Sequence, residues 1–286
     1  MLSALIAGLA IGALYAATAL AYNVMFSTSK VLSVTTGHLS MLGGVFGAWL
    51  MADKGLPIPL ALLFSVLIGA AFGWLTELIA IRRVLARSDE HLWLLSTLAL
   101  ATMVQQAVGL WWGTEPKPFP RLIPQEFSAG MPDQKYWLPV TVALLLALGR
   151  ELFYRRTLYG KLFVAMSEDT FAARARGIPT DLLRSFSYAL AGAMGALAGF
   201  AAGQLTFAFF ALGLTLTLNG FVALAVGGLG SNLGALVGGL ALGLLSAIAT
   251  YYLGGEYQQT ISVGLLMIVL LAKPEGLFGS AKTRPV

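Results

Sequence analysis

The stretch YRRTLYGKLFVAMSEDTFAARARGI, Tyr154 to Ile178, combines charged and apolar residues and stands between two long apolar runs. A helical arrangement places Leu162, Met166 and, less regularly, Phe171 along one side, with most of the Lys and Arg side chains elsewhere. Such a segment between two membrane spans can lie across a helix bundle and present a short projecting helix on which a soluble partner docks. The alternative is a solvated basic loop whose charge holds the orientation of the chain.

The rest of the chain is strongly apolar. Hydrophobic residues make up 58% of the 286 residues and charged residues only 11%, whereas soluble domains carry about 25% charged residues. Apolar runs long enough to cross about 30 Å of hydrocarbon recur along the sequence. We therefore expect an all-α polytopic membrane protein, a single transmembrane domain over residues 1–286 with a cytoplasmic segment at 155–185. The expected spans, about nine, cover residues 3–26, 32–52, 57–81, 91–113, 137–154, 186–209, 212–230, 233–253 and 257–272.

Positive charge beside the spans predicts the orientation, because Lys-rich and Arg-rich loops stay in the cytoplasm. With the N-terminus outside and the C-terminus in the cytoplasm, the Tyr154–Ile178 stretch and the loop bearing Arg82, Arg83 and Arg87 fall inside. Four of the 18 Lys and Arg residues then lie outside, namely Lys54, Lys117, Arg121 and Lys135. The apolar run at 3–26 has no basic region before it, so we expect a retained first helix rather than a signal peptide. The net charge of +5 is explained by these loops and does not indicate nucleic-acid binding.

The outer loop Thr114 to Tyr136, TEPKPFPRLIPQEFSAGMPDQKY, contains five prolines. Proline lacks a backbone N–H and fixes its φ angle, so a long helix cannot form there. We expect this loop to form a shaped lid or a docking surface outside the membrane.

Glycines gather at spacings of three and four in several spans, where helix backbones can approach closely. The pairs Gly43-Gly44 and Gly227-Gly228 belong to spans that start with the polar stretches TTGHLS and TLTLNG. We expect each pair to end an interrupted helix. The first four and the last four spans cross in opposite order, which predicts two inverted halves with one extra helix between them.

Polar residues inside the spans are the first candidates for function, because burying them is unfavourable unless they are satisfied. They form one cluster in each half, at corresponding positions. We expect these residues to line a translocation path for a small zwitterion or carboxylate, with backbone amides near Gly37 and Gly220 freed to face it. The alternative for each threonine is a hydroxyl bonded to its own helix. The clusters are Thr35, Thr36 and His38 in the first half and Thr215, Thr217 and Asn219 in the second.

Several kinds of chemistry lack the residues they need. The chain has no cysteine and only two histidines, and it shows no G-x-x-x-x-G-K-[ST] motif or paired carboxylates, so we expect no metal site, no cofactor and no enzyme activity of its own. Glu77 lies one turn from Arg82 and Arg83 and is expected to pair with them at the inner surface. No charged relay is visible deep in the spans, which disfavours an ion-driven carrier.

Four stretches resemble the membrane permease subunits of branched-chain amino acid ABC importers. They are GLAIGALYAA (8–17), RRTLYGKLFVAMSEDTFAARARGI (155–178), GGLGSNLGALVGG (227–239) and AKPEGLFG (272–279). The glutamate that precedes the Ala pair in the family is Phe171 here. SVTTGHLSMLG (33–43) stands where the family commonly shows NFAHGELFMLG, and the same broad family serves amides, urea and aromatic acids, so the resemblance leaves the solute open.

The resemblance implies a subunit that works with a second permease, expected to be a paralogue, two cytoplasmic ATPase subunits and an external solute-binding protein. ATP hydrolysis would then belong to the partners, and the location would be a bacterial inner membrane. A stand-alone secondary carrier and a purely structural membrane subunit remain as alternatives. The residues expected to dock on an ATPase subunit are Glu168, Asp169, Ala172, Ala173, Arg174 and Gly177.

Overall fold

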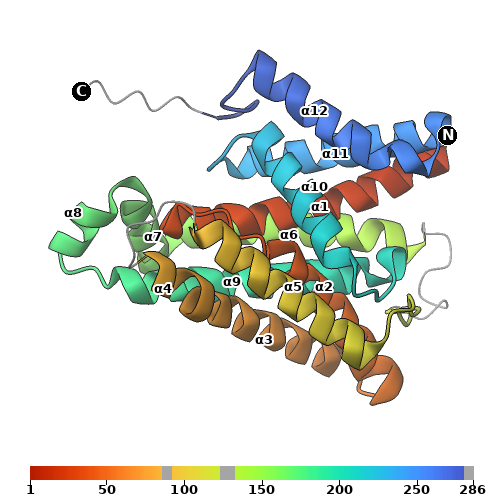
Figure 1. The fold of residues 1–286 in the computed structure, drawn as a ribbon, viewed down its shortest axis with the longest axis horizontal. Coiled ribbons are helices and arrows are strands. Elements are labelled where there is room, and N and C mark those ends of the chain that lie inside the picture. The colour runs from red at the N-terminus through yellow and green to blue at the C-terminus, as the bar shows by residue number, and fades with distance from the viewer. Residues whose placement is uncertain (86–91, 123–132, 280–286) are drawn as a thin grey trace.

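A computed structural model describes residues 1–85, 92–122 and 133–279 of the chain (Figure 1). Within these ranges the chain is helical and forms no β-strand, apart from one isolated bridge between Lys117 and Ala208. The α-helices are α1 (Leu2–Ser29), α2 (Thr36–Ala48), α3 (Ile58–Thr76), α4 (Arg82–Leu85), α5 (Leu92–Trp112), α6 (Gln134–Arg156), α7 (Leu158–Glu168), α8 (Thr170–Ala175), α9 (Thr180–Thr206), α10 (Leu212–Gly227), α11 (Asn232–Leu253) and α12 (Gln258–Ala272). Three short turns complete them, the π-helical η1 (Trp49–Asp53) and η2 (Glu77–Ile81) and the 3₁₀ turn η4 (Gly255–Tyr257).

Seven helices of the described chain are long and apolar enough to cross a membrane. They are α1, α5, α6, α9 and α11, together with the continuous helices Ile58–Val84 and Gly255–Ala272. Each of the nine predicted apolar runs coincides with a helix, but α2 and α10 are shorter, with 13 and 16 residues. The all-α membrane fold is confirmed, whereas the number of nine spans is not.

Helix α9 packs extensively against α1, α2 and α3. A Cβ atom at Gly192 would overlap the backbone of Gly69 on α3, and one at Gly199 would overlap the backbone of Ser40 on α2. These contacts bring backbones together without intervening side chains, as the glycine spacing predicts. Glycine therefore fixes α2 and α3 on two sides of α9.

The two interrupted helices are only partly as predicted. Gly228, with φ +103°, ends α10 as expected. Gly43 and Gly44, however, lie in the middle of α2, where Gly43 packs against the backbone of Ala196 on α9, so the prediction that this pair ends a helix was wrong. Close packing with α9, rather than a chain break, explains that pair. The inverted relation of the two halves stays a prediction.

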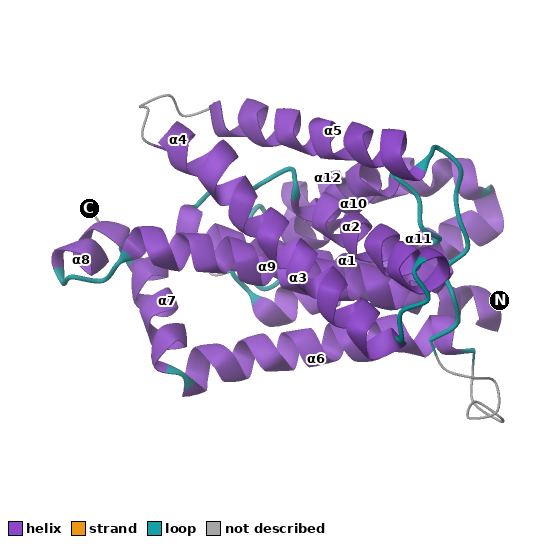
Figure 2. Ribbon diagram, turned by 90° about the horizontal axis from the view of Figure 1, so that it is seen from below, coloured by secondary structure: helices purple, strands orange, loops and turns teal. Residues whose placement is uncertain are grey.

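The two ends of the bundle differ. Helices α4, α7 and α8 lie at one end and the N-terminus lies at the other (Figures 1 and 2). At the end opposite α8, the first part of the outer loop is attached to the bundle: Ala208 exchanges two backbone hydrogen bonds with Lys117, of 2.9 and 3.1 Å, and Phe119 is buried against Phe200. Residues 123–132 of the predicted lid, Arg87, and the tail residues Lys282 and Arg284 lie outside the described residues.

Candidate functional site

Two short helices, α7 and α8, form the stretch between α6 and α9, and local hydrogen bonds fix their ends. The Thr157 hydroxyl accepts a 2.9 Å hydrogen bond from the Gly160 amide at the start of α7. The Asp169 carboxylate accepts bonds of 2.9 and 3.0 Å from the Phe171 and Ala172 amides at the start of α8. Acceptors of this kind satisfy the free amides of a first helical turn. Gly177, with φ +81°, follows the end of α8, as its predicted role as a helix terminator requires.

A small apolar cluster attaches these helices to the bundle. Phe163, Met166, Ala173 and Leu183 are buried together. Phe171 is 84% exposed, so the prediction that it shares the packed side with Met166 was wrong. The chain turns at Asp169, and α8 therefore starts a new helical phase.

The six predicted docking residues lie at the end of α7, within α8 and just after it, and they differ in exposure. Ala173 is buried in the apolar cluster, which removes it from the outer surface. Ala172 is half-buried, and Asp169 is occupied in capping the helix. Glu168, Arg174 and Gly177 are exposed. The exposed tip of α8 thus presents a large aromatic side chain as well as small residues.

The two predicted polar clusters meet where the start of α2 crosses α10. The Gly37 amide donates a 3.1 Å hydrogen bond to the Thr217 hydroxyl. That hydroxyl lies 2.8 Å from the Gly213 carbonyl and 3.0 Å from the Val34 carbonyl, and it can donate to either. The Gly37 amide is therefore not free to face a path, contrary to the prediction. Gly220, which packs against Thr18, lies inside α10 and does not expose a free amide either.

The other threonines of the first cluster also bond within the chain. The Thr36 hydroxyl donates to the Ser33 carbonyl at 2.8 Å, and the Thr35 and Ser33 hydroxyls lie 2.7 Å apart. In the second cluster, Thr215 is exposed. The structure thus places the buried threonine hydroxyls in helix packing, where they stabilise the junction.

Asn219 and His38 differ from the threonines because each keeps one polar atom without a partner. The Asn219 amide nitrogen donates to the Thr215 carbonyl at 3.0 Å, while its Oδ1 is buried and makes no hydrogen bond among the described residues. His38 Nε2 lies 3.2 Å from Gln105 Oε1, and Nδ1 is likewise buried without a hydrogen bond there. Buried polar atoms normally find partners, so these two atoms and the equally unpartnered Ser40 hydroxyl on α2 are candidates for contact with water or a solute.

Thr217 provides a test of the junction. Thr217→Val keeps the shape of the side chain but leaves the buried Gly37 amide without its acceptor, which generally costs about 1–3 kcal/mol. We expect a lower unfolding temperature of the detergent-solubilised protein. Thr215→Val, made on the exposed face of the same helix, should have a much smaller effect. If both variants unfolded at the same temperature as the parental protein, a stabilising role for this hydrogen bond would be contradicted.

A buried ionic cluster was missed by the sequence analysis. Glu77 contacts Arg82 at 3.5 Å as predicted, but its side chain is fully buried, and its closest charged partner is Arg184 of α9, at 2.9 Å. Ser185 also donates to the carboxylate, at 2.7 Å. Arg184 lies 107 positions further along the chain, and no local pattern connects the two residues. Glu77 is therefore not a surface residue of the inner interface.

The described chain is an all-α bundle of helices long and apolar enough to cross a membrane, with the two short helices α7 and α8 projecting from one end. The family described as branched-chain amino acid transport system permease component matches residues 4–270. The chain belongs to this family and is a permease subunit.

Two curated relatives match almost the entire chain. The high-affinity branched-chain amino acid transport system permease protein LivH of Escherichia coli (strain K12) is 29% identical, over 98% of this chain and 96% of its own length. Its counterpart BraD of Pseudomonas aeruginosa is 28% identical, over 100% of this chain and 98% of its own. Among solved structures, PsaBC from Streptococcus pneumoniae in complex with Fab matches with a TM-score of 0.53 and 14% identity, covering 96% of this chain and 92% of that chain, which shows a shared fold.

Proposed function

We propose that this permease subunit carries a branched-chain amino acid, or a related small carboxylate or amide, through a membrane-spanning path driven by ATP hydrolysis in two partner ATPase subunits. The observation that carries the proposal is the α7–α8 segment, which projects from one end of the bundle and exposes Phe171 at 84%. A projecting, capped helix with an exposed aromatic side chain is suited to dock in a cleft of a soluble protein. The relatives, named as permeases of branched-chain amino acid transport, favour the same reading.

The other subunits of the proposed transport complex are inferred from the presence of one docking segment in each permease chain. Residues 1–286 would form one permease domain, with 155–185 as its cytoplasmic coupling segment. Two ATPase subunits need two such segments, so the working unit would contain a second permease, which we expect to be a paralogue. An external solute-binding protein would deliver the solute on the opposite face of the inner membrane. In this arrangement the N-terminus lies outside and the C-terminus in the cytoplasm, which agrees with the position of α4, the helix that begins at Arg82, and α8 at the end opposite the N-terminus.

The path would run beside the α2–α10 junction. We propose that the Asn219 side-chain oxygen and His38 Nδ1, which have no partner among the described residues, offer polar contacts to the solute. Thr35, Thr36 and Thr217 would hold the junction in place, and Thr215, which is exposed, would be available from outside the helix. Because these groups are neutral dipoles, the affinity inside the path would be modest, and selection can be left to the binding protein.

Reconstitution tests the proposal directly. The chain is co-expressed with its ATPase subunits and second permease, incorporated into proteoliposomes, and supplied with binding protein and radiolabelled leucine. We expect uptake that requires ATP, and we expect Asn219→Ala to slow uptake while leaving basal ATPase activity intact. Thr102→Ala, on exposed α5 where the hydroxyl bonds only to its own helix at 2.9 Å, is the control and should transport at the parental rate.

Two results would contradict this reading. Uptake by the purified chain alone under an ion gradient, without ATP, would identify a secondary carrier. An Asn219→Ala variant with the parental uptake rate would remove Asn219 from the path without affecting the ATP-driven role.

A further inference from the structure

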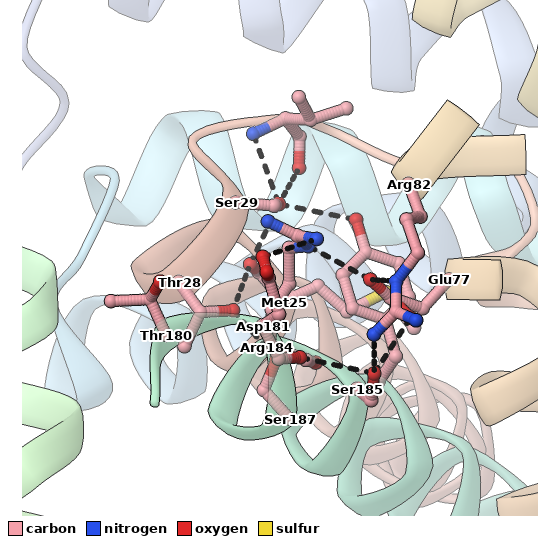
Figure 3. Close-up of polar contacts among 12 residues, drawn as sticks. Met25, Thr28, Ser29, Glu77, Arg82, Thr180, Asp181, Arg184, Ser185 and Ser187 are labelled. Atoms are coloured by element: carbon pink, nitrogen blue, oxygen red, sulfur yellow. Dashed lines mark hydrogen bonds and ion pairs between the residues drawn. The ribbon is translucent and has the colours of Figure 1, made fainter. Parts of the chain in front are cut away.

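Five charged side chains of alternating sign form a continuous series at the α8 end of the bundle. Figure 3 shows the part of this series around Glu77, Arg82, Asp181 and Arg184. The series starts on α8, passes through the first turn of α9 and ends at the junction of η2 and α4. In order, its contacts are Arg174 to Asp181 at 3.5 Å, Asp181 to Arg184 at 3.0 Å, Arg184 to Glu77 at 2.9 Å and Glu77 to Arg82 at 3.5 Å.

The inner part of the series is buried and the outer part is exposed. The Glu77 side chain is 0% exposed and that of Arg184 is 11% exposed, whereas Asp181 and Arg174 are more than half exposed. A buried carboxylate is tolerated where an opposite charge and hydrogen bonds compensate it. Arg184 Nε and the Ser185 hydroxyl supply these to the two Glu77 oxygens. The closest compensating groups of Glu77 therefore come from α9, and Arg82 of α4 is a more distant partner at 3.5 Å.

The backbone at Glu77 is also unusual. Glu77 opens the π-helical turn η2, between α3 and α4. Single π-turns inside α-helices are rare and occur frequently at functional sites. The charge and the irregular turn thus coincide in the part of the α3–α4 helix that faces α9.

Arg184 is shared between two carboxylates. Its Nε bonds to Glu77 and its Nη2 contacts Asp181. Asp181 is in turn shared with Arg174, which also bonds to the Thr180 hydroxyl at 3.1 Å. If α8 moves and Arg174 leaves Asp181, the Asp181 carboxylate is free to attract Arg184 more strongly. The ion pair between Arg184 and Glu77 is then weakened.

We propose that the Glu77–Arg184 pair is the positioning contact through which movement of α8 reaches the transmembrane helix α3. The inference rests on the proposed function, because it takes docking of an ATPase subunit as the cause of α8 movement. Allosteric coupling needs an element with two arrangements that both sites bias. Arg184, held either mainly by Glu77 or mainly by Asp181, is such an element. Other contacts keep α9 attached to α1 throughout, including the bond of 3.1 Å from the Tyr188 hydroxyl to Ser29.

The test measures solute uptake per ATP hydrolysed in proteoliposomes holding the complete complex. Glu77→Gln keeps the shape of the side chain and removes its charge. We expect ATP hydrolysis to continue, with uptake per ATP reduced by about fivefold or more, the lower end of the usual range for coupling between sites. Glu256→Gln is the matched control: it removes an exposed carboxylate from the short turn η4, outside this series, and should leave uptake per ATP unchanged.

A double variant separates coupling from folding. Glu77→Gln and Arg184→Gln remove opposite halves of one contact, so the double variant should lose no more coupling than either single variant. Independent, multiplying losses would overturn the proposal, as would unchanged uptake per ATP in Glu77→Gln. Failure of all three variants to assemble would assign the pair a purely structural role and overturn it as well. Uptake by the parental complex without ATP would instead refute the proposed function, whatever the variants show.

Discussion

Gly199→Val should strongly reduce the accumulation of folded protein. A side chain at Gly199 would overlap the backbone of Ser40 on α2, and a backbone cannot turn aside as the end of a flexible side chain can. Overpacking of this kind generally costs about 1–3 kcal/mol of stability and occasionally more. At Gly199 the added side chain meets backbone atoms of the neighbouring helix, so we expect a cost at the upper end of this range. With a total stability of about 5–15 kcal/mol for a typical protein, such a loss is a large fraction.

The measurement is the yield of monodisperse protein after detergent extraction, together with its unfolding temperature. Gly149→Val is the matched control, because Gly149 lies in the interior of α6 and has no atom near the position of an added Cβ. The same volume is added there to an open surface. A Gly199→Val protein that extracts and melts like Gly149→Val would show that α2 and α9 are not in contact as described.

Phe171→Asp should strongly weaken assembly with the proposed ATPase subunit while leaving the permease folded. The Phe171 ring is 84% exposed at the tip of α8 and packs against nothing in the apolar cluster beneath it, so its removal should not disturb the chain. An aromatic anchor in a protein interface is commonly worth about 2–4 kcal/mol, which corresponds to a loss of affinity of about 30- to 1,000-fold. Replacement by a carboxylate adds the unfavourable burial of a charge.

The affinity of the solubilised Phe171→Asp variant for the proposed ATPase subunit is measured, and the melting temperature of the variant checks that it is folded. Trp74→Ala is the control, an exposed aromatic residue on the membrane-spanning part of α3 that a soluble partner cannot reach. Binding of normal affinity by a folded Phe171→Asp protein would remove α8 as the docking element. It would leave the membership of the permease family unaffected.

Features that depend on neighbouring residues could be predicted from the sequence. Long apolar runs identified the helices, because hydrocarbon thickness fixes the length of a span. The termination of α8 near Gly177 was also predictable, since glycine readily adopts positive φ. The orientation of Phe171 was not, because the break at Asp169 resets the helical phase.

Features that depend on distant residues could not be predicted in the same way. Glu77 and Arg184 are 107 positions apart, and the charge of Glu77 was assigned to the nearest arginines. Likewise, Gly43 has a glycine neighbour and polar residues before it, which suggested a helix end, while its actual contact is the backbone of Ala196 on another helix. Both cases require knowledge of which faces of α9 meet α2 and α3.

The position of α9 between two glycine contacts has an evolutionary consequence. A position such as Gly192 or Gly199 rejects every other amino acid, because even the smallest side chain meets backbone there. Ser262, by contrast, is the one buried residue of α12 among those described. Selection should therefore remove most substitutions at these positions of α9, whereas α12 should tolerate many. The sequences of relatives should then diverge less in α9 than in α12. A comparison of many relatives should find the slowest substitution rates on the glycine faces of α9, α2 and α3.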